Sequence, residues 1–121
     1  MVSIPPFLLR RLYVKGSLRR TDDGFEFQLR NQLGSGYARQ MLPLKVNGKE
    51  VPLEQCSFSV DGQETPFTAV TPERPFTLAL NRTTIVKVRG VPLEPGTHKV
   101  AMGFVVQGFG ALSFDFTDVV S

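Results

Sequence analysis

The chain has 121 residues, of which 41% are hydrophobic, and this is the size and composition of a single domain with one core. Its formal net charge is +3, with the basic residues spread along the chain, so the charge favours solubility over a nucleic-acid partner. No apolar run is long enough to cross a bilayer, and the apolar stretch before Arg10 lacks the features of a secretory signal, so we expect no membrane partner.

The predicted elements are strands, because helical periodicity is nearly absent and 11 glycines and nine prolines interrupt the chain every few residues. Alternation of apolar and polar residues is clearest in 25–30 and 56–60, which predicts strands with one buried face. In chain order, the predicted strands cover residues 12–18, 25–30, 44–46, 49–51, 56–60, 76–80, 85–88, 99–107 and 111–116.

Turn residues separate these strands. Asn47-Gly48 is the strongest short hairpin signal, Asp61-Gly62 ends the strand 56–60, and Pro95-Gly96 leads into the closing hairpin. Seven to nine short strands at this spacing predict an antiparallel β-sandwich of the jelly-roll or immunoglobulin-like type, formed by residues 1–121 as one domain.

The alternation also assigns the faces of the strands. We expect Glu26, Gln28 and Ser59 to be exposed, because they alternate with the apolar positions. The residues expected in the core are Phe25, Phe27, Leu29, Val46, Phe58, Val60, Leu112, Phe114 and Phe116.

Candidate chemistry is sparse. His98, the single histidine, follows a Pro-Gly turn and is expected to be an ordinary turn residue, since a catalytic triad needs further partners. Cys56 is the single cysteine, so an internal disulfide is excluded and a cytoplasmic protein is expected. Because Cys56 shares a strand face with apolar residues, its thiol is expected to be buried and inert. The chain lacks the usual zinc ligand sets, so we expect no metal or other cofactor in it and no catalytic residue.

The segment 31–43 is the best candidate for a binding surface. It has no clear periodicity and is expected to be a long loop, which in a compact sandwich points to a function. Tyrosine, arginine and methionine are enriched at protein interfaces. The candidate residues are Gly34, Gly36, Tyr37, Arg39, Gln40 and Met41, together with Phe104 and Phe109 of the closing hairpin.

The strand 99–107 leaves two interpretations open. Phe104 and Val105 point to opposite faces and both are apolar, which fits a strand with a partner covering one face. A central strand, or a local bulge at 108–110, explains the same pattern without a partner.

A series of motifs runs through nearly the whole chain, namely Gly16-Ser17-Leu18, Gly24-Phe25-Glu26-Phe27 with Arg30, residues 44–51, residues 58–62 and residues 95–100. In the order of these motifs, the chain resembles the small β-subunits of bacterial C-glycoside deglycosidases. The resemblance implies a β-sandwich subunit that pairs with a larger (β/α)8-barrel subunit, which holds a divalent metal such as manganese and the catalytic residues for cleaving a carbon–carbon bond in a C-glycoside. Residues 33–39 depart from the family pattern, so the substrate and even the reaction can differ.

Two function classes follow. The first is a non-catalytic subunit of a hetero-oligomeric, glycoside-processing enzyme, which stabilises or shapes the site of a barrel-type catalytic subunit. The second is a stand-alone β-sandwich for binding or scaffolding that self-associates. An independent hydrolase with paired carboxylates ranks third, because the acidic residues fall mostly at turns and on outward strand positions.

Overall fold

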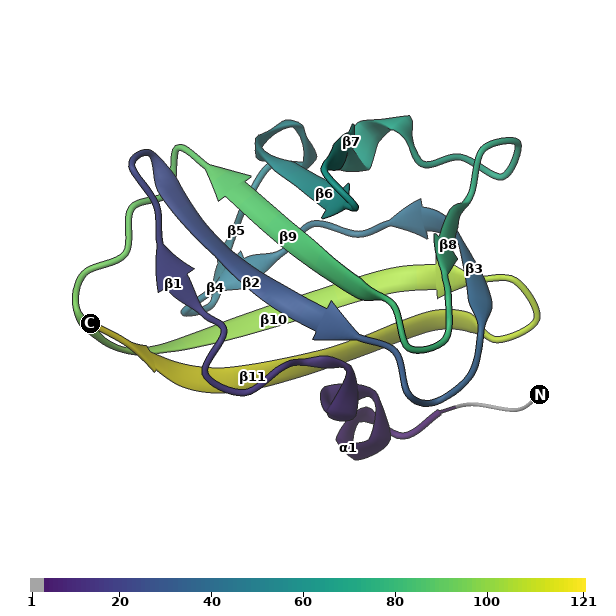
Figure 1. Ribbon diagram of the computed structural model, residues 1–121, viewed down its shortest axis with the longest axis horizontal. Helices are drawn as coiled ribbons and strands as arrows, with labels where there is room; N and C mark the ends of the chain where they lie inside the picture. Colours follow the sequence, from purple (N-terminus) through teal and green to yellow (C-terminus); the bar gives the residue numbers. More distant parts are fainter. Residues whose placement is uncertain (1–3) are drawn as a thin grey trace.

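The computed structural model describes residues 4–121 and confirms an all-β sandwich built from two antiparallel sheets (Figure 1). Sheet A has the strand order β1-β2-β9-β6-β7. Its strands are β1 (Arg19–Arg20), β2 (Gly24–Arg30), β9 (Thr83–Arg89), β6 (Cys56–Val60) and β7 (Gln63–Pro66).

Sheet B is organised around one long hairpin. β10 (Gly96–Val106) pairs along its whole length with β11 (Gly110–Val120), and its other edge is shared by two shorter units. These units are the hairpin of β4 (Lys45–Val46) with β5 (Lys49–Glu50), and the pair of β3 (Gly36–Met41) with β8 (Phe76–Leu78). β10 is therefore a central strand. A central strand explains why Phe104 and Val105, on opposite faces, are both apolar, without a partner that covers one face.

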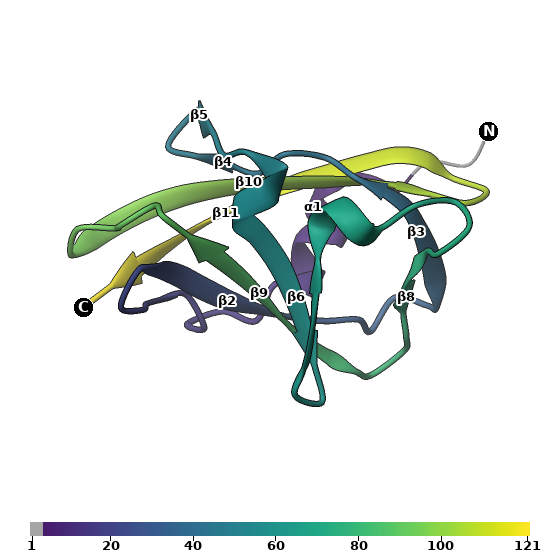
Figure 2. The same cartoon turned by 90° about the horizontal axis from the view of Figure 1, so that it is seen from above.

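The two sheets lie face to face, with β10 and β11 on one side and β2 and β9 on the other (Figure 2). The helical segments are short: α1 (Pro6–Leu9), which lies against β11, and the 3-10 turns Arg10–Leu12, Leu53–Gln55 and Phe67–Ala69. Within residues 4–121, no helix has the length and apolar character that crossing a membrane requires.

The core forms between the sheets, as the alternation predicts. Phe27 of β2 meets Phe116 of β11 edge to face, with ring centroids 5.0 Å apart, and so joins the two layers. Phe58 stacks on Phe76 with centroids 3.9 Å apart. Every residue expected in the core is buried except Val60, which is half-buried near the end of β6.

The three polar residues expected to be exposed are not: Gln28 is half-buried, and Glu26 and Ser59 are buried. Glu26 is 8% exposed and Ser59 is 8% exposed, although both lie on the outer face of sheet A. The faces are assigned correctly, because Phe25 and Phe27 fill the core. Long side chains of neighbouring strands cover the outer face; Arg19, for example, lies 3.2 Å from the carboxylate of Glu26.

Both predicted tight turns are confirmed. Asn47 and Gly48 have φ values of 53° and 85°, and Asp61 and Gly62 have 51° and 83°. Positive φ at two successive residues is the requirement of a type I′ hairpin turn, which Asn-Gly and Asp-Gly satisfy at low cost.

Two predicted elements are wrong, and strand β7 was missed. Residues 12–18 are not a strand; only Tyr13 forms an isolated bridge, to Leu29, and the chain then turns at Gly16. The segment 31–43 is not a loop throughout, because residues 36–41 form β3. Strand β7 was not predicted, since all four of its residues are exposed and show no alternation in burial.

Candidate functional site

The outward side of β3 is the first candidate surface. The register with β10 shifts so that Val105 pairs with Gln40 and Val106 pairs with Ala38, which leaves Arg39 as the extra residue of a β-bulge. Because of this bulge, Arg39 and Gln40 are both exposed while Ala38 and Met41 on either side are buried.

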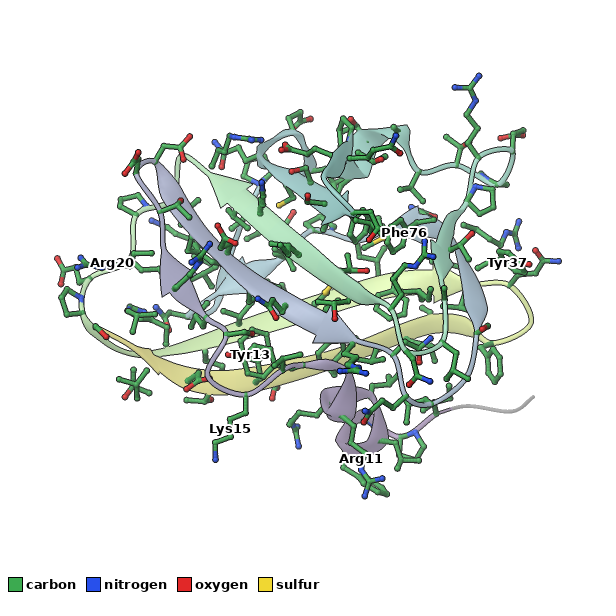
Figure 3. All side chains as sticks on the ribbon, in the orientation of Figure 1. Arg11, Tyr13, Lys15, Arg20, Tyr37 and Phe76 are labelled. Atoms are coloured by element: carbon green, nitrogen blue, oxygen red, sulfur yellow. The ribbon has the colours of Figure 1, made fainter. Side chains whose placement is uncertain are left out.

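Tyr37 lies at the centre of this surface. Its side chain is 54% exposed and points away from the body of the molecule (Figure 3). Its backbone is held firmly, because it pairs with Thr77 of β8 and its carbonyl accepts a 3.0 Å hydrogen bond from the amide of Gln107. We call Tyr37, Arg39, Gln40 and Val105 the β3 face.

Arg39 carries a charge that no acidic side chain pairs with in the part of the chain that the structure describes. A planar guanidinium with free donors next to an exposed aromatic ring is well suited to bind a carboxylate or to stack on a second ring.

The predicted interface residues do not all lie together. Tyr37, Arg39 and Gln40 form the exposed β3 face, whereas Gly34, Gly36 and Phe109 border a cavity at the neighbouring end of the sandwich. Met41 and Phe104 are 3% and 2% exposed and belong to the core, so they are not part of the exposed surface of the free chain, and a role for them at an interface stays a prediction. They pair with each other across β3 and β10, on the inward side of the sheet.

We call this second candidate site the end cavity. It has a volume of about 130 Å³ and opens at the end of the sandwich between the 31–35 loop and the tip of the β10–β11 hairpin. Its walls come from sheet B, the loop that follows β2, the tip of the closing hairpin and the N-terminal helical segment. The apolar lining residues are Ile4, Leu9, Leu12, Leu33, Leu78, Phe104, Val106, Phe109 and Leu112.

Asn31 is the buried polar side chain of the end cavity. Its Nδ2 donates to the carbonyls of Gly34 and Leu78 at 2.7 and 2.8 Å, and its Oδ1 accepts from the amides of Leu33 and Gly34 at 3.0 and 3.3 Å. Four hydrogen bonds exhaust the capacity of a primary amide. An asparagine before a Gly-Ser-Gly turn is a typical loop organiser and is a local signal for this role, whereas the bond to Leu78, which is distant in the chain, has no local signal.

The candidate nucleophile and base are engaged in structural roles. His98 Nδ1 lies 2.9 Å from the side-chain amide of Asn47, and Nε2 lies 2.6 Å from the carbonyl of Glu94, so both ring nitrogens are occupied. Burial raises the pKa of the Cys56 thiol to about 12, which leaves almost no thiolate at neutral pH. Within residues 4–121, no group of three or more His, Cys, Asp or Glu side chains is placed to hold a metal ion.

A second polar cluster, which the sequence did not reveal, joins the N-terminal segment to β11. The Tyr13 hydroxyl donates to Asp118 Oδ2 at 2.6 Å and accepts from the amide of Leu18, while the amide of Gly16 donates to the same carboxylate oxygen at 2.7 Å. We call these four residues the seam. Tyr13 and Asp118 are 105 positions apart in the chain, which explains why no local sequence pattern predicts the seam.

The seam shifts the pKa of both its titratable groups. Burial, followed by the hydrogen bond to Asp118, raises the pKa of Tyr13 to about 12. The hydrogen bond from Tyr13 lowers the pKa of Asp118 below its usual value. Because its carboxylate accepts hydrogen bonds from Tyr13 and Gly16, Asp118 anchors the N-terminal segment to β11.

Comparison with known proteins identifies the family. Residues 8–121 match the family model of the hydroxymethylglutaryl-CoA reductase N-terminal domain, and a search of curated proteins gives no match. The resemblance to the β-subunits of C-glycoside deglycosidases is therefore wrong. Its motifs were mainly Asn-Gly, Asp-Gly and Pro-Gly turns within alternating strands, which many β-sandwiches share. Because the match covers nearly the whole length, the chain belongs to the hydroxymethylglutaryl-CoA reductase N-terminal domain family.

Proposed function

We propose that this chain is a non-catalytic interaction domain that docks on another folded domain through the β3 face. The observation that carries the proposal is Tyr37, an aromatic side chain 54% exposed on a strand whose backbone is fixed by neighbours on both sides. A rigidly mounted tyrosine beside an exposed arginine is the usual composition of an interface anchor.

The state of the reactive side chains supports a role without catalysis. His98 and Cys56 are committed to internal contacts, and Tyr13 is committed to the seam. The description of the matching family, an N-terminal domain of a reductase, supports a domain that acts together with other domains. In this proposal, catalysis and any cofactor belong to the partner, and the single buried thiol fits a reducing, cytoplasmic compartment.

Photo-crosslinking tests the docking surface directly. A benzophenone amino acid replaces Tyr37 in one variant and Lys87, on the outer face of sheet A, in a matched control. We expect a defined heteromeric product from position 37 and none from position 87. Equal yields from both positions would overturn the proposal.

The same experiment separates the runner-up function, a self-associating scaffold. A crosslinked dimer of this chain from position 37, with no heteromeric product, would replace the proposed partner domain by a second copy. Sedimentation of the purified chain at rising concentration then measures whether the dimer forms without the crosslinker.

A further inference from the structure

We propose that the end cavity is a binding site for a small apolar ligand, namely one hydrocarbon ring or a branched alkyl group of similar size. This proposal is independent of docking through the β3 face. The cavity has a volume of about 130 Å³ and is open at the end of the sandwich. An apolar protein cavity of ~150 Å³ stays dry and binds benzene, so a volume of this order accommodates a single ring.

The composition of the walls decides the class of ligand. Asn31 has used all its donors and acceptors on backbone groups of its own loop and of β8, and the Ser35 hydroxyl accepts a hydrogen bond from the amide of Leu80. The remaining lining side chains are aliphatic or aromatic. A water molecule inside needs two to four polar partners, and these mostly apolar walls offer few, since the Asn31 side chain is saturated and Ser35 is the remaining polar side chain; an apolar group needs none.

Gly36 of β3 leaves room for the end cavity, because a glycine has no side chain to fill it. It lies within a strand and its φ is not positive, so its backbone conformation is open to other residues. A glycine inside a strand weakens the strand and often marks the close approach of a ligand. A Cβ at this position would contact Val106 Cγ1 at 3.6 Å, so a side chain here extends into the space that the cavity occupies.

The mouth of the cavity is also apolar. Leu33 is 40% exposed at the rim, and Phe109, at the tip of the β10–β11 hairpin, is half-buried beside it. The 31–35 loop and the segment after β8 are held together by the bond from Leu80 to Ser35. A ligand therefore enters between side chains rather than through an opening of the sheet.

Titration with fluorobenzene, followed by fluorine NMR, by proton–nitrogen NMR of the backbone amides and by thermal unfolding, tests the proposal on the full chain. We expect saturable binding, a rise of Tm with fluorobenzene concentration, and amide shift changes confined to the 31–36 loop, Leu78 and Phe109. Absence of saturable binding up to the solubility limit, or shift changes elsewhere in the chain, would overturn it.

Two substitutions at Gly36 make the test specific. Gly36→Ala places one methyl group at ordinary contact distance and should weaken binding by about tenfold, since one methylene in an apolar pocket is worth ~10–200-fold. Gly36→Val should abolish binding and raise Tm without ligand, because it fills the cavity and suits a strand. Binding retained in both variants would contradict the assignment.

A control variant excludes adsorption to exposed apolar side chains. Val119→Ala shortens a side chain that is 62% exposed and lies at the opposite end of β11. Fluorobenzene affinity should be unchanged in this variant. A loss equal to that of Gly36→Ala would show non-specific binding to the surface.

Discussion

The two tyrosines of the chain lie in regions that use an aromatic ring in opposite ways. In the seam, the Tyr13 ring stacks on Phe116 with centroids 3.6 Å apart, and its hydroxyl bonds to Asp118. On the β3 face, the ring of Tyr37 is 54% exposed, and its side chain forms no hydrogen bond with residues 4–121. The seam satisfies its groups internally, whereas the β3 face leaves an anchor available, so stability and binding are assigned to different parts of the molecule.

The largest expected effect is on the seam. Asp118→Ala removes the acceptor of Tyr13 and of the Gly16 amide and should lower the free energy of unfolding by about 3 kcal/mol, because hydrogen bonds to a charged group contribute ~1.5–3 kcal/mol each. Tyr13→Phe keeps the stack on Phe116 and should cost about 1–2 kcal/mol. Urea unfolding measures both. A loss below about 0.5 kcal/mol in Asp118→Ala, which is the size of an ordinary surface substitution, would contradict the distinction between the two regions.

The next effect is on binding and leaves stability unchanged. Tyr37→Ala should weaken association with the partner domain by about 2 kcal/mol, roughly thirtyfold, while the free energy of unfolding changes by less than ~0.5 kcal/mol. Arg39→Ala should follow the same pattern with a smaller loss of affinity. Calorimetric titration measures the affinity, and unchanged affinity in both variants with the fold intact would move the interface away from the β3 face.

Alkaline pH should weaken the seam over a defined range. The pKa of Tyr13 is about 12 in the folded chain and 10.0 as its ordinary value, so the folded state holds this proton more tightly. The resulting stability is present below pH 10 and is lost as pH rises from 10 towards 12. Absorbance at 295 nm should show a tyrosine that ionises near pH 12, and this step should be missing in Tyr13→Phe; an unchanged profile would disprove the assignment.

The smallest expected effect is on the outer face of sheet A. Glu64 accepts two hydrogen bonds from Arg89, at 2.6 and 3.0 Å, which lower its pKa from 4.5 to about 2. Its contribution is therefore present above pH 4.5 and lost as pH falls towards 2. Arg89→Ala should reduce this acid dependence but cost under about 1 kcal/mol at neutral pH, because both side chains are well exposed. If the acid unfolding curves of the unchanged chain and of Arg89→Ala coincide, the Arg89–Glu64 pair does not stabilise the fold.

The sequence predicted the fold well because its signals are local. Alternation in Phe25–Arg30 and the Asn47-Gly48 turn depend on neighbouring residues, and the structure confirms both. Strand β3 was missed because its bulge at Arg39 breaks the alternation, and β7 was missed because it is exposed throughout. The seam could not be predicted, since only the folded chain brings Tyr13 next to Asp118.

The candidate site was likewise predicted only in part. Exposure of Tyr37, Arg39 and Gln40 agrees with the composition of the segment, while Met41 and Phe104 have the composition of an interface but the positions of a core. Residue type alone does not distinguish these cases, because the face of a strand depends on its register with a distant neighbour. The family was also misassigned from motifs that any sandwich can carry.

Hydroxyl-radical footprinting of the complex with the partner domain tests the central claim most directly, because two other exposed side chains, Phe7 and Val119, serve as internal comparisons for Tyr37. Tyr37, Phe7 and Val119 are 54%, 65% and 62% exposed in the free chain. We predict that oxidation of Tyr37 falls sharply on complex formation, while oxidation of Phe7 and Val119 is unchanged. Protection of Phe7 or Val119 with Tyr37 still fully reactive would contradict the assignment of docking to the β3 face.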